Sequence, residues 1–177
     1  FSLWNDLGSS FGMCSHEYLR SVEARRIFDI NTSWESFAWE SACDLFRESE
    51  ELVVDLIMDQ SRLPGVGNII KCEGLFAAKI FPLRRCCELS LAEWKDLLVE
   101  LHGFSAKWYE HCQKSFNGQQ MGCCHLMRIY GHWNCSSCQQ QVSLIKEGKR
   151  QRITYFCPEC QPRRPSKTTE RASVQRR

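Results

Sequence analysis

The feature that most constrains the fold of this chain is a pair of C-x2-C motifs near its C-terminal end. Cys135-Ser-Ser-Cys138 and Cys157-Pro-Glu-Cys160 are separated by 18 residues, a spacing typical of four-cysteine zinc sites. Each motif forms a turn with two thiolates on one side, and two such turns complete a tetrahedron around a zinc ion. Since four thiolates leave no position for water, we predict a structural Zn²⁺ held by these four cysteines. The alternative is a pair of redox-active or incidental turns.

The other cysteines indicate the compartment. The chain contains 12 cysteines in 177 residues, which in a secreted protein would indicate disulfides. The opening FSLWNDLGSS lacks the basic region and cleavage motif of a signal peptide, and no run of 18 apolar residues predicts a transmembrane helix. A reducing compartment with bound zinc is therefore the better interpretation. The remaining eight are then buried small side chains or surface thiols: Cys14, Cys43, Cys72, Cys86, Cys87, Cys112, Cys123 and Cys124.

Charge is distributed unevenly along the chain, although the net charge is only +2. Residues 146–177 contain ten Lys and Arg against three acids, a balance of +7, which leaves −5 for residues 1–145. A basic end on a mildly acidic body favours a polyanionic partner such as nucleic acid. For residues 163–177 taken alone, the simpler interpretation is a solvated basic tail.

Hydrophobic residues at helical spacing predict four helices ahead of the cysteine motifs. We expect them over residues 33–49, 49–60, 66–78 and 90–112. Two capping boxes are predicted, Thr32 with Glu35 and Ser90 with Glu93, and Gly103 is expected to interrupt the last helix. A short strand over 21–30 is expected to lead into this helical region.

The periodicity changes beyond residues 116–130, which we predict to be a connecting loop. The stretch QVSLIKEGKRQRITYF (141–156) predicts two short strands around a KEGKRQ turn, so that a β-hairpin joins the two cysteine motifs. The expected fold class is therefore mainly α with a small β-hairpin zinc finger.

The joint between the second and third helices, SRLPGVGNIIK, has the composition of an anion site. Pro64 presets φ, whereas Gly65 and Gly67 permit positive φ and the close approach of another backbone. The following helix begins with N–H groups that lack internal partners and carry partial positive charge, which suits a DNA phosphate. Asn68 adds an amide donor, and Lys71 lies one turn further on. The alternative is an ordinary corner between two helices.

Basic residues cluster on the predicted turn of the hairpin and on its returning strand. A rigid hairpin that presents guanidinium groups suits the phosphates of a nucleic-acid backbone. A solvated turn is also rich in Lys and Gly, so both interpretations stay open for Lys146 and Lys149. Arg152 is the stronger candidate because it leads directly into ITYFC. The predicted DNA-binding residues are Gly67, Asn68, Lys71, Lys149, Arg150 and Arg152.

Two blocks of the sequence resemble a known family. Helix-hairpin-helix DNA-binding proteins use a similar LPGVG turn, but MDQSRLPGVGNIIKCEGLF (58–76) is more similar to the helix-two-turn-helix of the formamidopyrimidine-DNA glycosylase/endonuclease VIII family. RITYFCPECQ (152–161) resembles the C-terminal zinc hairpin of the same family. Both blocks occur in the expected order, and the resemblance covers roughly residues 21–162.

The resemblance implies a base-excision DNA repair protein with structural zinc. Members of this family remove oxidised bases and cleave the abasic strand by β-elimination, so they are bifunctional DNA glycosylase/AP lyases. The family residues matched by Asn68 and Arg152 hold phosphates near the lesion. The implied partner is damaged DNA, duplex or single-stranded, bound by a monomer in the nucleus and not at a membrane.

The resemblance also divides the chain into five parts. Residues 1–32 would be a remnant of the N-terminal catalytic domain with a linker, and residues 33–116 the helix-two-turn-helix DNA-binding domain. A linker over 117–130, a zinc finger over 131–162 and a basic tail over 163–177 complete the expected organisation.

Catalysis in this family uses an amine at the extreme N-terminus, from Pro or Val, and a following Glu. The chain begins with Phe1, so we expect a fragment or trimmed chain without catalytic residues, which binds DNA but does not excise bases by itself. Asp59 and Glu73 lie near the joint, and we interpret them as solvated or capping acids rather than catalytic ones.

Two other functions stay open at this point. One is a non-enzymatic DNA- or RNA-binding module that keeps the phosphate-binding residues without a catalytic domain. The other is a zinc-ribbon adaptor for protein interactions, which would show no salt-dependent binding of DNA.

Overall fold

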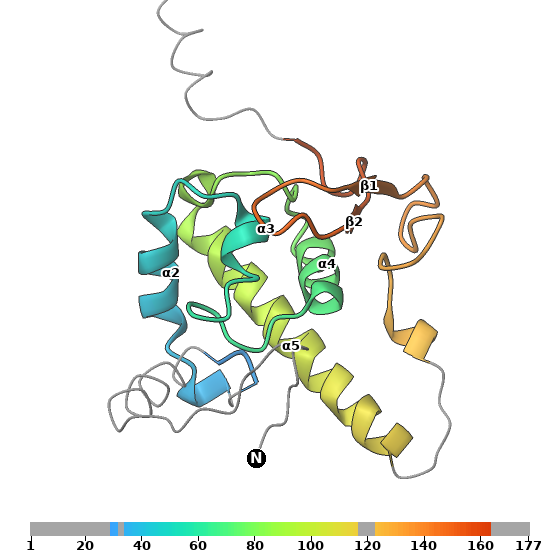
Figure 1. The fold of residues 1–177 in the computed structure, drawn as a ribbon, viewed down its shortest axis with the longest axis horizontal. Helices are drawn as coiled ribbons and strands as arrows, with labels where there is room; N and C mark the ends of the chain where they lie inside the picture. The colour runs from blue at the N-terminus through green and yellow to red at the C-terminus, as the bar shows by residue number, and fades with distance from the viewer. Residues whose placement is uncertain (1–28, 32–33, 117–122, 164–177) are drawn as a thin grey trace, which may run out of the picture.

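A computed structural model of the chain describes residues 29–31, 34–116 and 123–163. Helices form most of the regular secondary structure in these ranges, and a small antiparallel hairpin lies against them (Figure 1). The predicted fold class is therefore confirmed. Most of the strand expected over 21–30, together with Thr32 and the basic tail, falls outside the described residues. No helix in the described ranges has the length and apolar character needed to span a membrane.

The first predicted helix is divided into two shorter elements. A 3-10 helix covers Trp34–Ser36, and α2 covers Trp39–Arg47. Phe46 on the inner face of α2 is buried, and its ring packs against Trp94 with the ring centroids 5.4 Å apart. The apolar spacing that predicts this helix thus corresponds to the face that enters the core.

The helix predicted over 49–60 is wrong in extent, because α3 covers only Val53–Leu56. On its N-terminal side, Leu52 is extended and forms an isolated antiparallel bridge instead of a helical turn. On its C-terminal side, the Asp59 carboxylate accepts hydrogen bonds from the Ser61 backbone N–H and hydroxyl at 2.9 and 2.7 Å. A short polar side chain that binds nearby backbone offers the chain an alternative to helix, and the predicted helix ends there.

The third predicted helix is confirmed as α4 (Asn68–Ala77), and it packs against the long α5 (Leu91–Phe116). Gly74 lies at this contact. A Cβ at Gly74 would be 2.4 Å from a side-chain carbon of Leu101, so the two helices approach more closely than any larger residue would permit. Figure 1 shows α5 running diagonally past α4, with its C-terminal end extending beyond the body.

The start of α5 is as predicted, but its interior is not. Ser90 Oγ accepts a hydrogen bond from the Glu93 N–H at 3.2 Å, and the Glu93 carboxylate accepts one from the Ser90 N–H at 2.9 Å, which completes the capping box. The helix continues through Gly103 without a break. A glycine inside a helix costs only about 1 kcal/mol relative to alanine, and the fully buried Leu101 beside it anchors this part of α5 in the core.

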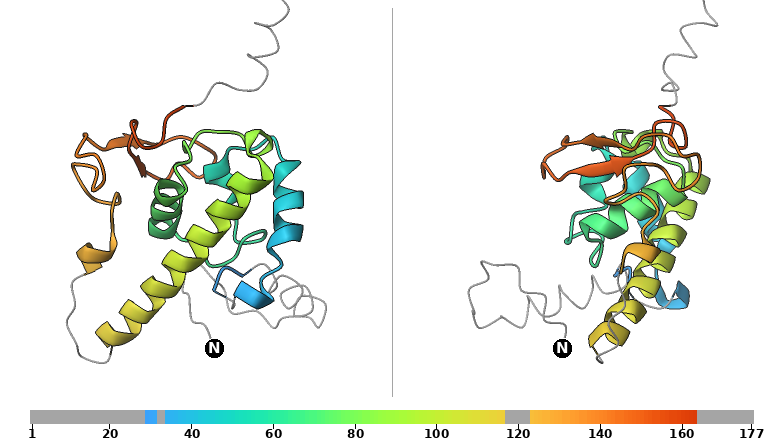
Figure 2. Two further views of the ribbon diagram at one scale, coloured as in Figure 1. Left: turned by 180° about the vertical axis from the view of Figure 1, so that it is seen from behind. Right: turned by 90° about the vertical axis from the view of Figure 1, so that its right-hand side faces the viewer.

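The predicted hairpin is confirmed, with β1 (Ser143–Ile145) antiparallel to β2 (Thr154–Phe156). Figures 1 and 2 show it lying across one end of the helical body, over α4. Phe156 faces the helices, and its ring meets Phe81 edge to face with centroids 5.5 Å apart. The segment predicted as a connecting loop contains a 3-10 helix, Cys123–Leu126. An apolar cluster joins the hairpin region to α4: Cys72, Phe76, Ile129, Cys135, Val142 and Cys157.

Candidate metal centre and nucleic-acid interface

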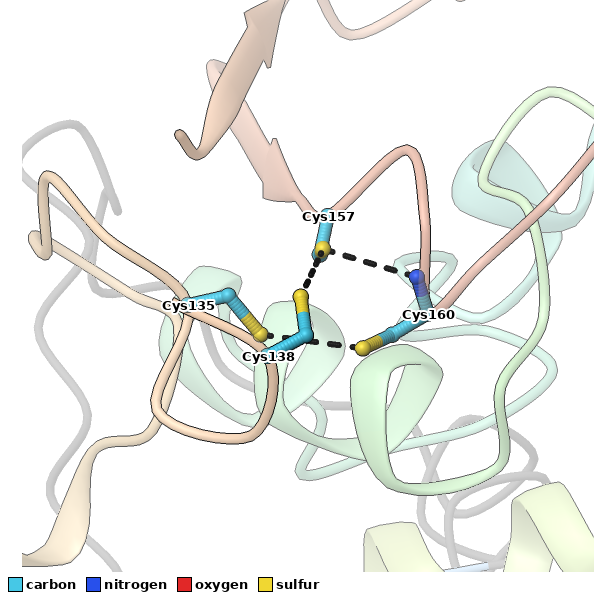
Figure 3. A group of neighbouring side chains, drawn as sticks. All are labelled: Cys135, Cys138, Cys157 and Cys160. Atoms are coloured by element: carbon cyan, nitrogen blue, oxygen red, sulfur yellow. Dashed lines mark hydrogen bonds between the residues drawn. The ribbon is translucent and has the colours of Figure 1, made fainter. Parts of the chain in front are cut away.

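The four cysteines of the C-x2-C motifs meet beside the hairpin with their sulfurs pointing toward one another (Figure 3). All four Sγ atoms lie within 4.8 Å of one another. The Cys135–Cys160 sulfurs are 3.7 Å apart and the Cys138–Cys157 sulfurs 3.4 Å. With Zn–S bonds of about 2.3 Å, the edge of a tetrahedral four-sulfur site is about 3.8 Å. The distances therefore fit a tetrahedral zinc ion.

The acid–base chemistry of these thiols also suits a cation. Burial raises the pKa of the Cys160 thiol, and the neighbouring Cys138 and Cys135 raise it further. For Cys135, burial is outweighed by hydrogen bonds from the backbone N–H groups of Cys138 and Ser137, and its pKa falls to about 7. Thiolates this close repel one another unless a cation lies between them. Four sulfur ligands are typical of structural zinc and leave no open position for catalysis.

The joint ahead of α4 contains the tight turn that its glycines and proline predict. Gly65 has a φ of +91°, and a Cβ at this position would lie 2.3 Å from Asn31 Nδ2. The Gln60 side chain spans the turn, accepting from the Gly65 N–H at 3.0 Å and donating to the Val66 carbonyl at 2.9 Å. Sequence reasoning did not single out Gln60, because only the folded turn places both backbone groups within its reach.

Gly67 differs from the prediction, because its φ is −92° rather than positive. It is the N-cap of α4, and no side chain at that position caps the helix. A Cβ at Gly67 would meet nothing within 4 Å, so the packing of the described residues does not require glycine there. The start of this ten-residue helix is thus open to an anion, which its N–H groups attract.

Asn68 links the start of α4 to the hairpin. Its Nδ2 donates to the Ile153 carbonyl at 3.0 Å, which places the amide beside the residue between Arg152 and the start of β2. An amide has two N–H donors, so one is left after this bond. The Asn68 Oδ1 atom is buried and accepts no hydrogen bond from the described residues. Two residues that the sequence singles out as phosphate donors thus lie on backbone segments that touch.

Lys71 is not at the surface, as the predicted DNA contact would require. Its side chain is 1% exposed, and its Nζ donates to Thr154 Oγ1 at 2.8 Å. Burial lowers the pKa of Lys71, Arg152 lowers it further, and Asp55 raises it. Lys71 is therefore a buried cation that connects α4 to β2.

The predicted DNA contacts at the tip of the hairpin, Lys149 and Arg150, face acids of the helical body. The Lys149 ammonium pairs with Glu51, and an Arg150 nitrogen lies 3.6 Å from an Asp59 oxygen. Arg62 joins the same two acids, with distances of 2.6 Å to Glu51 and 3.2 Å to Asp59. The hydrogen bond from Lys149 is the main cause of the lowered pKa of Glu51. The tip is therefore held in a network of alternating charges.

Arg152 has a different environment from the tip. Its side chain is exposed, and within the described ranges no carboxylate lies at ion-pair distance from it; the same holds for Lys146. Arg152 is next to Ile153, whose carbonyl accepts the bond from Asn68. The structure thus brings Asn68 and Arg152 together, while Lys149 and Arg150 are engaged with acids and Lys71 is buried.

Two buried side chains that sequence reasoning did not assign to the interface attach the cysteine-bearing region to α4. Glu73, fully buried, accepts hydrogen bonds at 2.9 to 3.0 Å from the backbone N–H groups of residues 128–130. Glu73 therefore acts as a capping acid, but the backbone N–H groups that it caps begin 55 residues further along the chain. Gln161, also fully buried, accepts from the Cys157 N–H at 3.0 Å and donates to the Ile80 carbonyl at 2.8 Å. Their only sequence signal is a polar residue within or beside an apolar run.

Comparison with known proteins places this geometry in context. No family model matches the chain. Endonuclease 8-like 3 from Mus musculus is 31% identical over 151 residues, which cover 85% of this chain and 24% of that protein. Formamidopyrimidine-DNA glycosylase from Vibrio cholerae is 32% identical over 135 residues, which cover 72% of this chain and 49% of that protein. The chain therefore spans about a quarter to a half of the length of these relatives.

The fold is shared with a solved structure of the same group. The complex of Lactococcus lactis Fpg (MutM) with a FAPY-dG-containing DNA aligns with a TM-score of 0.69 at 22% identity, covering 84% of this chain and 56% of that one. The sequence relatives, this fold and the four-cysteine hairpin agree with the resemblance seen in the sequence. The chain belongs to the formamidopyrimidine-DNA glycosylase/endonuclease VIII family.

Proposed function

We propose that this chain binds damaged DNA as the C-terminal half of a base-excision-repair DNA glycosylase/AP lyase, whose complete form removes oxidised bases and cleaves the abasic strand. The observation that carries the proposal is the bond from Asn68 to the Ile153 carbonyl. It joins the open start of α4 to the segment just before β2, which bears Arg152. The DNA present in the Lactococcus lactis Fpg complex supports damaged DNA as the ligand.

The proposed contact is a single backbone phosphate held from two sides. The α4 N–H groups and the remaining N–H of Asn68 lie on one side, and the Arg152 guanidinium on the other. Zn²⁺, held by the four cysteines, would supply a rigid link between the two strands of the hairpin. We call this arrangement of the α4 start, Asn68 and Arg152 the phosphate clamp. Because phosphate contacts carry little base information, the phosphate clamp supports affinity rather than the choice of lesion.

The organisation of the chain follows from the same proposal. We infer a helix-two-turn-helix domain over 33–116 and a zinc finger over 131–162, which share one binding surface. Both sides of the clamp come from one polypeptide, which supports binding as a monomer. The relation to vertebrate endonuclease 8-like proteins supports a nuclear location. The 177 residues are proposed to hold DNA without excising bases.

The proposal is tested with the zinc-loaded chain and fluorescent oligonucleotides that contain an abasic-site analogue, as duplex and as single strand. We expect the dissociation constant to rise steeply with salt, with a log–log slope of about 0.9 per phosphate neutralised on duplex DNA. Flat salt dependence would support the protein-adaptor alternative. Borohydride treatment of the complex should trap no covalent adduct, and an adduct would overturn the inferred lack of activity. Equal binding of an RNA strand would instead favour a non-enzymatic nucleic-acid module.

A further inference from the structure

Asp55 of α3 is a buried acid whose carboxylate faces the hairpin rather than the solvent. Asp55 is only 8% exposed, and one of its carboxylate oxygens accepts a hydrogen bond from the Lys149 backbone N–H at 2.9 Å. This contact joins residues 94 positions apart. A buried carboxylate that accepts a bond from the main chain fixes the position of that main chain, since the bond is lost if the turn moves.

The other side of this contact is Gly148. Its φ is +91°, and a Cβ there would lie 2.6 and 2.8 Å from the two Asp55 carboxylate oxygens. The turn therefore approaches Asp55 so closely that no side chain fits between them. The left-handed conformation and the lack of space both require glycine at this position. The tip of the hairpin is thus seated on α3 by geometry as well as by the charges of Lys149 and Arg150.

The seated turn determines where Arg152 lies. Only two residues separate Lys149 from Arg152, and the next residue, Ile153, is held by Asn68. The short segment between the tip and β2 is therefore fixed at both ends, by Asp55 at one and by Asn68 at the other. Arg152 lies within this span, exposed and without a carboxylate partner among the described residues.

We propose that Asp55 is a positioning residue, which seats the Gly148–Lys149 turn and thereby holds Arg152 beside Asn68 for binding one DNA phosphate. This inference rests on the proposed function, because it assigns how the phosphate clamp is held. It makes an unusual prediction about charge. Removal of an acid should strengthen the binding of a polyanion if only long-range electrostatics matter. Removal of Asp55 should weaken it.

The experiment compares Asp55→Ala with Glu50→Ala in the zinc-loaded chain. Both remove one negative charge, but the Glu50 side chain is 76% exposed, and its ion pair among the described residues is with the exposed Arg85. We expect Asp55→Ala to raise the Kd for the abasic-site duplex about three- to tenfold, the range that corresponds to one hydrogen bond. Glu50→Ala should leave the Kd unchanged or lower it. Asp55→Asn keeps an acceptor oxygen and should bind within about twofold of wild type.

A double-mutant cycle separates positioning from a general loss of structure. If Asp55 acts through Arg152, Asp55→Ala should change binding by less than about twofold in an Arg152→Gln background. Zinc content and Tm are measured for every variant. Gly148→Ala disrupts the same contact from the hairpin side and should raise the Kd as Asp55→Ala does. This second variant keeps the proposal testable if Asp55→Ala does not fold.

Different outcomes overturn different claims. If Arg152→Gln binds as wild type does, the phosphate clamp itself is wrong. If Arg152→Gln weakens binding while Asp55→Ala binds as tightly as Glu50→Ala, the clamp stands and the positioning role of Asp55 is wrong. Failure of Asp55→Asn to restore binding would contradict the hydrogen bond to Lys149 as the means of positioning.

Discussion

The hairpin presents basic side chains in two places that differ in what lies opposite them. At the tip, Lys149 and Arg150 face Glu51 and Asp59. Arg152, two residues beyond the tip, is exposed and has no carboxylate partner among the described residues. A surface ion pair contributes only about 0 to 1 kcal/mol to stability. Its larger consequence here is that the tip presents little net charge to a polyanion, whereas Arg152 presents a full one.

The comparison shows that a cluster of basic residues in sequence does not reveal which of them already face acids in the fold. The charge that a DNA strand meets is the local sum over side chains within a Debye length, about 10 Å at 0.1 M salt. At the tip this sum includes acids from a distant part of the chain, such as Glu51, which lies 98 residues before Lys149. Substitutions at each place test this difference.

Removal of the metal is expected to have the largest effect, because it releases the tip and Arg152 together. Chelation of zinc, or the substitution Cys157→Ser, should raise the Kd for DNA about a hundredfold or more, since structural zinc supplies the folding energy of small metal domains. Far-UV circular dichroism should show that α4 and α5 stay folded. The exposed Cys87 provides the control, and Cys87→Ser should bind DNA as wild type does.

Arg152→Gln tests the unpaired side of the comparison. We expect a rise in Kd of about ten- to a hundredfold, as for a charge-assisted hydrogen bond. The slope of log Kd against log salt should fall by about 0.9, the value of one phosphate contact on duplex DNA. Titrations across a salt series measure both quantities. An unchanged slope would mean that Arg152 contacts no phosphate.

Lys149→Gln and Arg150→Gln test the paired side. Each should raise the Kd less than about threefold and leave the salt slope within about 0.3 of wild type, because the acids at the tip already offset these cations. The same titrations measure the effect. A loss as large as that of Arg152→Gln would show that the tip leaves its acids to contact DNA, and the distinction between the two places would fail.

The ion pair between Arg84 and Glu93, which lies outside the hairpin, should affect stability alone. Burial opposes ionisation of Glu93, but hydrogen bonds from Arg84 and Ser90 outweigh burial and lower its pKa to about 2. Glu93→Gln should lower the free energy of unfolding at pH 7 by about 1 to 3 kcal/mol.

The pH dependence of the Glu93 effect has a definite sign. The folded-state pKa is lower than the unfolded value near 4.5, so the stabilisation is complete above pH 4.5 and is lost as the pH falls toward 2. Denaturant titrations of wild type and variant should therefore converge over this range. A constant difference would place the stabilisation elsewhere. DNA affinity at pH 7 should stay within about twofold of wild type.

Local features of the fold could be predicted from the sequence because short-range chemistry determines them. The capping box of Ser90 and Glu93, the helix after Gly67 and the two cysteine turns each depend on residues fewer than about ten positions apart. The length of α3 could not be predicted in this way. Its apolar spacing indicates helix, but the bridge at Leu52 and the turn at Asp59 depend on the chain that packs beside it.

The candidate site shows the same division between features set by local sequence and features set by distant contacts. Asn68 and Arg152 could be proposed as phosphate contacts from local patterns, one at a helix start and one on a basic hairpin. The burial of Lys71 and the docking of Asp55 and Glu73 against the hairpin region depend on contacts between residues 55 to 94 positions apart. No local pattern distinguishes these side chains from solvated ones. Only the packing of the hairpin on α4 and α3 does so.

The central claim is that Asn68 and Arg152 hold one phosphate between them. The most direct test replaces each phosphate of the abasic-site duplex, one at a time, by a neutral methylphosphonate. We predict one backbone position at which this replacement weakens binding of the wild-type chain about tenfold or more. The loss at that position should disappear in both Asn68→Leu and Arg152→Gln. A loss spread evenly over many phosphates, or one that persists in either variant, would contradict the account.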